Sequence, residues 1–371
     1  MDQLFALGSN GSGQLGLGHY EDVSVPKQIY DSPCFDNDSI THVAAGGNHT
    51  ILITATGNAY CSGDAGDGRC GTVTNNDGEG NLPTFRKLKL SHSTATTPII
   101  AFAACTWDST ILAIRDEEGR ATRIYVCGSA SPYSKESLDR VALIPDFPPV
   151  GTAIVNLAAG FRHVVAVLDN GDVYGWGASG KGQLGEIDGT PNAPKFIEEP
   201  RKVMDIPFKV ARAVCCQYTT CLIAEPGDGR IVILGADKWG LKSRAPVEIP
   251  SWQAITAGWG AIYVLKRDGT LLAWGRNDHG QLPPPGLPHI SQVVAGSEHV
   301  IALTESGEAL AWGWGEHGNC GPNVEKKSGN VEGRWNVLAS PKTLPEDSRV
   351  TAVGAGCATS WINVTTEGVY L

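Results

Sequence analysis

Two kinds of residue in this sequence bind metals or act as nucleophiles in other proteins: ten cysteines and nine histidines. No two cysteines stand in a Cys-x-x-Cys pair, so the usual spacing of a zinc site is absent. Cys215, Cys216 and Cys221 form the one cluster, and a buried cysteine in an apolar strand commonly acts as a small hydrophobic residue. A chain of 371 residues also buries enough surface to fold without a metal or a disulfide. We therefore expect no metal and no other cofactor.

Three of the histidines recur at one position of an internal repeat. His49, His163 and His299 each stand three residues after a short run of small side chains. A metal held by all three would need side chains to converge from separate repeats, so a repeated hydrogen bond between strands is the favoured role. No Ser, His and Asp set and no pair of acidic residues stands out as a catalytic constellation, and we expect no enzyme activity.

Four glycine-rich segments match the dinucleotide-binding pattern G-x-G-x-x-G. They are residues 11–16, 66–71, 180–185 and 313–318. The pattern binds a nucleotide where it follows a strand, opens a helix and precedes an acidic residue by about 20 positions. No helical periodicity follows these segments, and they recur with the repeat, which indicates a turn instead. Nucleotide binding is therefore not expected.

Composition and charge set the class of protein. Glycine supplies 46 of 371 residues, well above the usual ~7 %, which suits short strands and tight turns better than helices. The formal net charge is −10, and no basic patch of the kind that binds nucleic acid is visible. No apolar run approaches the ~20 residues of a membrane span, and the N-terminus does not look like a secretion signal. We expect a cytoplasmic or nuclear protein that binds neither nucleic acid directly nor a membrane.

One motif recurs seven times along the chain and sets the predicted fold. Its clearest copies are Val-Ala-Ala-Gly at residues 43–46 and Leu-Ala-Ala-Gly at residues 157–160, and the seven copies end at residues 46, 105, 160, 216, 258, 296 and 356. A second motif ending in Gly follows each of the first six, and a seventh copy, residues 5–8, opens the chain. Apolar runs split by Asn-Gly or Asp-Gly lie between the two motifs and predict hairpins. The period has room for four strands, so we predict an all-β, seven-bladed β-propeller that forms a single domain over residues 1–371.

The two ends of the chain carry complementary halves of one repeat. We therefore expect the strand around residues 4–7 to pair with the strand around residues 360–364 and to close the ring, which removes exposed sheet edges. Residues 368–371 resemble a further copy of the second motif, and whether they pair beside Phe5 is left open.

Insertions near 72–98, 129–156 and 322–349 interrupt the repeat. Long loops commonly carry recognition, although tolerated surface insertion explains each of them equally well.

Residues 8–16, 177–185 and 275–282 resemble the signature of the regulator of chromosome condensation repeat, and with the seven small-residue motifs the resemblance covers the whole chain. Residues 312–321 and the lack of an appended domain are similar to the fungal alpha-tubulin suppressor branch of that family. The branch implies a non-catalytic propeller that forms a heterodimer with the small zinc-ribbon protein of diphthamide biosynthesis. The pair would support diphthamide formation and Elongator-dependent modification of tRNA wobble uridines. The family's namesake implies the alternative, a guanine-nucleotide exchange factor or regulator for a small GTPase, although the basic tail of chromatin-bound members is lacking.

The sixth repeat predicts a partner site. Trp314 stands where the other repeats hold Ser9, Asp64, Ser129, Ala178, Ala236 or Arg276, so it fills no packing role that the repeats share. Glu316 and His317 add a charge and a titrating group beside it, and an aromatic anchor with polar neighbours is typical of an interface centre. The predicted partner-binding residues are Trp314, Glu316, His317, Asn319, Trp335, Trp259 and Trp239. The alternative is that Trp314 packs on the adjacent blade and stabilises the ring.

Overall fold

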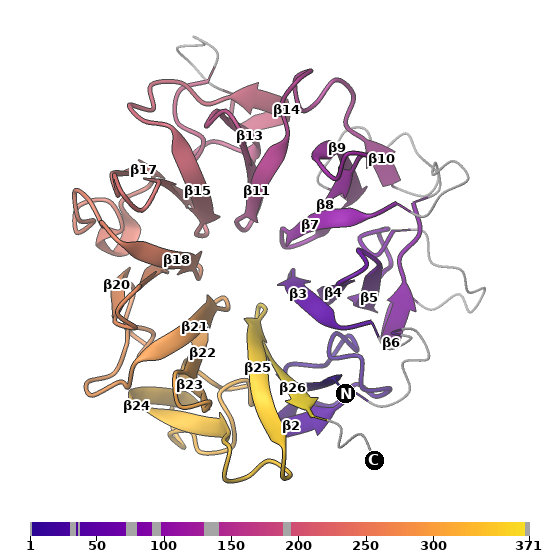
Figure 1. The fold of residues 1–371 in the computed structure, drawn as a ribbon, viewed down its shortest axis with the longest axis vertical. Coiled ribbons are helices and arrows are strands. Elements are labelled where there is room, and N and C mark those ends of the chain that lie inside the picture. Colours follow the sequence, from indigo (N-terminus) through magenta and orange to yellow (C-terminus); the bar gives the residue numbers. More distant parts are fainter. Residues whose placement is uncertain are drawn as a thin grey trace.

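The computed structural model describes residues 2–29, 35, 38–71, 80–90, 98–129, 141–187 and 194–367. Within these residues the chain forms seven antiparallel sheets that surround a central axis (Figure 1). A single 3-10 turn, Lys238–Gly240, is the one helical segment in the described parts of the chain, and none of their helical structure is long and apolar enough to cross a membrane. The expected all-β, seven-bladed propeller is confirmed.

We number the blades in chain order from residue 40. Blades 1 to 3 have four strands each. Blade 1 contains β3 (Ile40–Ala45), β4 (His49–Thr54), β5 (Ala59–Asp64) and β6 (Asn81–Lys87), and blade 2 contains β7 (Ile100–Cys105), β8 (Ser109–Arg115), β9 (Ala121–Gly128) and β10 (Val141–Leu143). Blade 3 contains β11 (Ile154–Ala159), β12 (His163–Leu168), β13 (Val173–Ala178) and β14 (Phe196–Lys202).

Blades 4 and 5 have three described strands each, and blades 6 and 7 have four. Blade 4 contains β15 (Val210–Cys215), β16 (Thr219–Ala224) and β17 (Ile231–Gly235), and blade 5 contains β18 (Trp252–Ala257), β19 (Ala261–Lys266) and β20 (Leu271–Gly275). Blade 6 contains β21 (Ile290–Ala295), β22 (His299–Thr304), β23 (Ala309–Trp314) and β24 (Asn330–Ala339). Blade 7 contains β25 (Ser348–Ala355), β26 (Thr359–Thr366), β1 (Asp2–Gly8) and β2 (Val23–Gln28).

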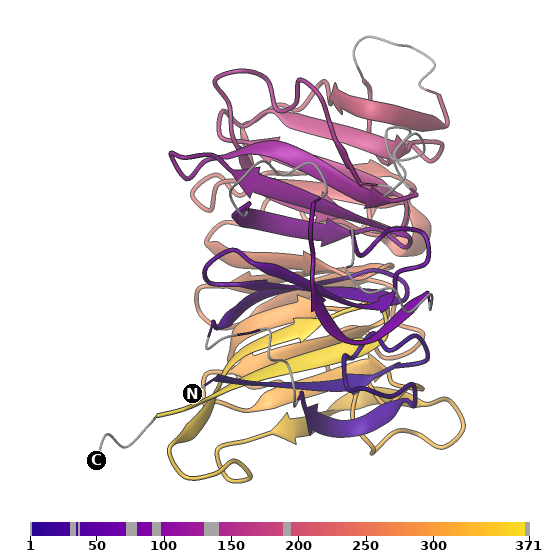
Figure 2. The same cartoon turned by 90° about the vertical axis from the view of Figure 1, so that its right-hand side faces the viewer.

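The small-residue motif forms the first strand of every blade, the one closest to the central axis (Figure 1). Small side chains suit this position because seven strands crowd together there. The second strands β4, β12, β16 and β22 are buried at every residue. A strand is buried on both faces when its sheet is covered on both sides, and here each blade is covered by its two neighbours, which Figure 2 shows as a stack.

The last blade joins the two ends of the chain. Its strand order is β2-β1-β26-β25, and β1 pairs antiparallel with β26, with Leu4 opposite Asn363 and Leu7 opposite Ser360. The predicted pairing is therefore confirmed. Trp361 of β26 is buried and lies with its ring centroid 6.0 Å from that of Phe85 in blade 1, so closure also joins the cores of the last and first blades. Residues 368–371, whose role was left open, lie outside the described residues.

Of the three predicted insertions, the third is described in full. Residues 322–349 contain the outer strand β24, which completes blade 6. The first contributes β6 to blade 1 through residues 81–87, and the second contributes β10 to blade 2. Residues 72–79, 91–97 and 130–140 of these two segments lie outside the described part of the structure.

Successive strands of a blade run in opposite directions, which defines the two sides of the disc. The turn between the first and second strands and the loop after the third strand lie on the same side. We call this side the loop face. In blade 1 it comprises residues 46–48 and 65–71.

Candidate partner-binding face

The loop face holds most of the predicted partner residues. Trp259 lies in the turn between β18 and β19, Trp239 in the loop after β17, and Trp314 at the end of β23. The Trp314 backbone N–H donates to the Glu298 carbonyl in the neighbouring turn (2.9 Å). The structure therefore collects tryptophans from three blades on one side of the disc.

Three aromatic rings meet where the central channel opens on the loop face. We call Trp107, Phe161 and Trp259 the mouth cluster. The ring centroids are 5.3 Å apart for Trp107 and Phe161, 5.8 Å for Trp107 and Trp259, and 5.6 Å for Phe161 and Trp259. All three side chains are half-buried, so each ring packs against the others and still presents surface to solvent. Contacts of this kind add about 0.5–1.5 kcal/mol per pair beyond area burial.

Only Trp259 of the mouth cluster was predicted: Phe161 was not singled out, and Trp107 was hidden because the alignment of the repeats is one residue out of register in blade 2. The motif was ended at Cys105, but the structure gives Thr106 the position of Gly160. The Thr106 N–H donates to the Ser109 carbonyl (3.0 Å), as the Gly160 N–H donates to the His163 carbonyl (2.9 Å). With that correction Trp107, Phe161 and Trp259 occupy one repeat position, and the alignment alone would have found them.

Backbone hydrogen bonds join these turns from blade to blade. The Trp107 N–H donates to the Phe161 carbonyl (3.0 Å), and the Gly47 N–H donates to the Trp107 carbonyl (3.0 Å). On the other side of the channel, the Trp259 N–H donates to the Ser297 carbonyl (2.8 Å). The mouth cluster is thus held on a hydrogen-bonded rim, which limits the freedom of its backbone.

A second aromatic group lies beside the mouth cluster. The ring of Trp239 packs against Gly260, where an added Cβ would lie 2.9 Å from its Cε3 atom. The Lys238 Nζ atom lies 3.9 Å from the centre of the Trp239 ring, and the Arg276 guanidinium carbon lies 4.9 Å from it. Trp239 has a φ of 59°, which is rare for a bulky residue. Such backbone strain persists where the surroundings impose it, and it is common at functional sites.

Arg276 is fixed by acidic neighbours. Its Nε atom donates to Asp278 (2.6 Å) and its Nη1 atom donates to Glu298. Burial raises the pKa of the Glu298 carboxyl, while the hydrogen bonds from Gln281 and Arg276 oppose that rise. The guanidinium therefore presents a preorganised cation against the face of Trp239.

Trp314 and His317 form a contact within blade 6, and His317 also reaches across a blade boundary. The Trp314 and His317 rings meet edge to face with centroids 5.2 Å apart, and Glu316, which lies between them in the sequence, is exposed. The His317 Nδ1 atom lies 2.7 Å from Asp22 Oδ2, and Asp22 Oδ1 accepts from the Asn10 backbone N–H (2.8 Å). The structure thus places Trp314 against His317 beside the exposed Glu316, and it also gives His317 an internal partner in blade 7.

Two of the predicted partner residues differ from the others: Asn319 lies in the loop after β23 but is buried, and Trp335 lies in the outer strand β24. Asn319 is fully buried, and its side-chain amide donates to the Trp314 carbonyl (2.7 Å). It positions the loop and does not face a partner. Trp335 lies in β24 between Val331 and Asn336, packed against the core of blade 6, so the structure does not place it with Trp314 on the loop face.

The three repeated histidines lock neighbouring blades together. Their Nε2 atoms bond to hydroxyls of the next blade: His49 to Thr110 (2.9 Å), His163 to Thr220 (3.0 Å) and His299 to Ser360 (3.0 Å). The Thr220 hydroxyl donates to the Gln183 carbonyl (2.7 Å). Its proton is committed there, so His163 Nε2 must be the donor. Burial lowers the pKa of His49 to about 3 and those of His163 and His299 to about 4. The predicted hydrogen-bonding role is confirmed, with the bonds running between blades.

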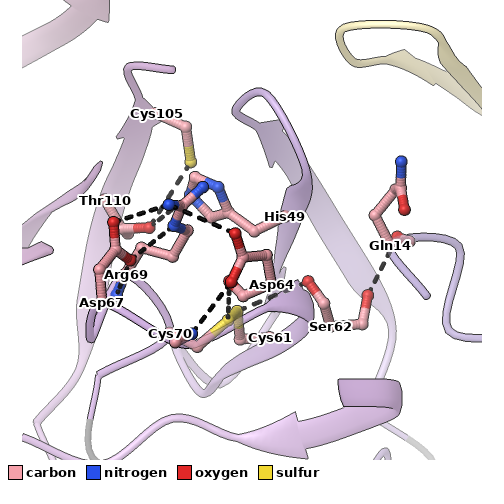
Figure 3. Close-up of a disulfide and its surroundings, with 11 residues drawn as sticks. Gln14, His49, Cys61, Ser62, Asp64, Asp67, Arg69, Cys70, Cys105 and Thr110 are labelled. Carbon is pink, nitrogen blue, oxygen red and sulfur yellow. Dashed lines mark hydrogen bonds and ion pairs between the residues drawn. A yellow bond between two sulfur atoms is a disulfide. The ribbon is translucent and has the colours of Figure 1, made fainter. Parts of the chain in front are cut away.

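The structure contains one feature that the sequence analysis did not predict, a disulfide between Cys61 and Cys70 in blade 1 (Figure 3). The loop that it anchors also carries Arg69, whose guanidinium pairs with Asp67 (2.6 Å) and Asp64 (3.4 Å). Seven other cysteines of the described residues are free. No three His, Cys, Asp or Glu side chains in the described ranges are grouped so as to hold a metal ion.

A signal for this disulfide does exist in the repeat. In blade 3 the corresponding positions hold Gly175 and Leu184, and a Cβ added to Gly175 would lie 2.7 Å from Leu184 Cδ2. The two positions are therefore in contact across the blade. A cysteine at both of them places two thiols within bonding reach.

Comparison with known proteins agrees with this architecture. Residues 3–362 match the model of the RCC1-like domain. An RCC1 repeat-containing protein of Schizosaccharomyces pombe is 29% identical over 304 residues, which cover 75% of this chain and 78% of that protein. The mouse secretion-regulating guanine nucleotide exchange factor is 29% identical over 302 residues, and the match covers 75% of this chain and 61% of that protein. The match thus spans less than two thirds of the length of the mouse protein.

Solved structures share the fold. Prp20p of Saccharomyces cerevisiae matches with a TM-score of 0.79 at 20% identity, over 99% of this chain and 92% of that one. Human WBSCR16 matches with a TM-score of 0.76 at 17% identity, over 99% and 100% of the two chains. With a family model matched along nearly the whole length, the chain belongs to the family of RCC1-like domains.

Proposed function

We propose that this chain is a non-catalytic, protein-binding propeller that engages its partner through the loop face. The observation that carries the proposal is the gathering of half-buried aromatic side chains and an ordered arginine on that face: the mouth cluster, Trp239 with Arg276, and Trp314. Tryptophan, tyrosine and arginine are the residues most enriched at the energetic centres of interfaces.

The proposed partner is the small zinc-ribbon protein of diphthamide biosynthesis, bound as a heterodimer in the cytoplasm or nucleus. The pair would support diphthamide formation and Elongator-dependent modification of tRNA wobble uridines. Support comes from the resemblance of the sixth repeat to the fungal alpha-tubulin suppressor branch, and Trp314 and His317 of that repeat lie together on the loop face. In this role the propeller would cover one face of the partner's metal site and leave the metal chemistry to the partner.

Titration calorimetry with the two purified proteins tests this assignment. We expect a one-to-one complex for the intact chain and a weaker one for Trp259→Ala. Val247→Ala serves as the matched control, because Val247 is exposed and adjoins Glu248, which bridges to Arg230 before the start of β17, at the end of blade 4 opposite the loop face. No heat of binding at tens of micromolar protein would overturn the choice of partner, and equal affinity of all three chains would overturn the choice of face.

A second candidate function is nucleotide exchange on a small GTPase. It is favoured by the mouse relative, which is named a secretion-regulating guanine nucleotide exchange factor. Release of a fluorescent guanine nucleotide from purified small GTPases measures this activity. Acceleration by the intact chain would support exchange, and an unchanged release rate across the tested GTPases would count against it.

A further inference from the structure

A cavity of about 150 Å³ lies at the channel mouth, under and beside the mouth cluster. Its floor is formed by the last residues of the innermost strands, among them Ala45, Ala159 and Ala295. An engineered apolar cavity of about 150 Å³ in another protein holds one benzene molecule. The space at the mouth is therefore that of a single aromatic ring or a branched aliphatic side chain.

The lining provides no counter-ion for a charged guest. The residues around the cavity are Ala, Gly, Cys, Thr, Ser, Trp and Phe, with no charged side chain among them. The two hydroxyls are already engaged, since Ser297 donates to the Cys357 carbonyl and Thr106 donates to Asp108. A charged group would lose its hydration here without gaining a counter-ion, and the ring faces would compensate a cation only in part.

The thiols of the cavity do not change this conclusion. Burial raises the pKa of Cys105 and of Cys215 to about 12 and that of Cys357 to about 11. All three stay protonated at neutral pH and act as small apolar groups. The cavity thus offers its occupant ring faces, small apolar side chains and backbone polar groups, and no charged side chain.

The cavity is open to one side. Aromatic rings form a wall at blades 2, 3 and 5, whereas blades 1, 6 and 7 hold Gly47, Ser297 and Cys357 at the same repeat position. A group that enters over the small residues meets the faces of the mouth cluster. The backbone bonds between the turns fix that wall before anything binds, and preorganisation of this kind lowers the cost of binding.

We infer that the channel mouth is an anchor pocket for one uncharged aromatic or branched aliphatic side chain, carried on a loop of the protein partner. The source of the side chain rests on the proposed function, but the pocket and its preference do not. The pocket adjoins the Trp314 patch, because the Trp314 N–H donates to Glu298 (2.9 Å), the neighbour of the lining residue Ser297. One partner would therefore reach both with a single surface.

Ligand-observed NMR with the intact chain tests the preference of the pocket. The probes are toluene, benzylamine and benzoate, which share a ring and differ in charge. We expect toluene to bind with a dissociation constant in the millimolar range and the two charged probes to bind at least tenfold more weakly. Absence of toluene binding, or equal binding of benzylamine, would overturn the inference.

Two variants tie the probe to this cavity. Cys357→Phe fills the space and should abolish toluene binding, whereas Val247→Ala, at an exposed residue that does not line the cavity, should leave it unchanged. Phe161→Ala removes one wall and should weaken toluene binding, which keeps the test valid if Cys357→Phe does not fold. If toluene binds Cys357→Phe as tightly as it binds the intact chain, it occupies another site and the inference is wrong. If only Phe161→Ala folds, equal toluene binding by that variant and the intact chain has the same meaning. If the intact chain binds toluene but does not bind the zinc-ribbon protein, the pocket is supported and the choice of partner is wrong.

Discussion

At the scale of single residues, the glycines that end the small-residue motif are explained by the histidines that follow them. A Cβ added to Gly46, Gly160 or Gly296 would collide with the imidazole three residues later and with a carbonyl oxygen of the next blade. Repeats without that histidine are free to differ at this position, and the structure places Thr106 and Cys216 there. The pattern Gly-x-x-His is thus a packing unit between blades.

We predict that Gly160→Ala destabilises the protein by roughly 1–3 kcal/mol, the range for overpacking a tight interior. Gly11→Ala is the matched control, because an added Cβ there meets nothing within 4 Å. Denaturant unfolding of both variants measures the difference. Equal stability of the two would show that the histidine and the next blade move apart at little cost.

We predict that Trp314→Ala weakens partner binding by about 2 kcal/mol or more, the size of an interface hot spot, and changes the melting temperature little. The half-buried ring touches His317, whose bond to Asp22 does not depend on the indole. Calorimetry of the complex and thermal unfolding of the free chain give the two values. Unchanged binding with a lower melting temperature would assign Trp314 to ring closure instead.

At the scale of strands and blades, histidine locks join only some neighbours. They connect blades 1 and 2, 3 and 4, and 6 and 7. The seam between blades 7 and 1 has no such lock: Trp361, Phe85 and Tyr60 lie in one buried apolar cluster, and the Ser62 hydroxyl donates to the Gln14 carbonyl (3.0 Å). The histidine locks respond to pH, whereas these contacts of the seam do not.

The locks predict a stability that falls in mild acid. The unfolded chain holds these histidines near pKa 6.5, and the native state holds His49 at about 3 and His163 and His299 at about 4. Between pH 6.5 and 4 the unfolded state binds more protons, so the free energy of unfolding decreases as pH falls through that window. The contribution levels off below about pH 4 for His163 and His299 and below about pH 3 for His49. His163→Gln keeps a donor and should remove about a third of the slope. A free energy of unfolding that stays flat from pH 6.5 to 4 would contradict the native pKa values.

The disulfide of blade 1 predicts a redox-dependent stability. Closing the short loop between Cys61 and Cys70 contributes roughly 2 kcal/mol, so a phosphine reductant should lower the melting temperature. The double variant Cys61→Ala and Cys70→Leu copies the small residue and leucine found at these positions in other blades, and it should melt at one temperature with or without reductant. An intact chain that is indifferent to reductant would contradict a stabilising role.

The repeat makes most of the fold predictable and much of the site unpredictable. Seven copies of a motif define seven blades, and halves of a repeat at the two ends define closure through β1 and β26. Trp107 was missed because a one-residue difference in register is hard to see without the turn geometry. Asn319 was misjudged because burial depends on the neighbouring blade, where Ser360 donates to its carbonyl. The Gly-x-x-His pattern encodes one contact between blades, whereas contacts such as the one that buries Asn319 are set by the whole ring.

At the scale of the whole molecule, closure of the ring depends on the N-terminal segment. Removing residues 1–18 would leave one edge of β26 unpaired and would empty the positions of Leu4 and Leu15 in the buried cluster. We predict a sharply lower melting temperature or an insoluble protein, because an exposed strand edge invites aggregation. A synthetic peptide of residues 1–29 supplied in trans should restore part of the stability. A truncated chain that melts like the intact one would show that the ring does not need this strand.

The closing pair also sets an order of events during synthesis. Asp2 and Thr365, which hydrogen-bond across β1 and β26, are 363 residues apart. At 5–20 residues per second a ribosome makes the second residue roughly 20–70 s after the first. The N-terminal segment has a binding surface on blade 1 before β26 is made: the Gly18 N–H donates to the Pro83 carbonyl (2.8 Å), and Leu17 bridges to Thr84. The N-terminal hairpin of the nascent chain can thus pack on blade 1, the first complete blade to be synthesised, before the last blade is completed.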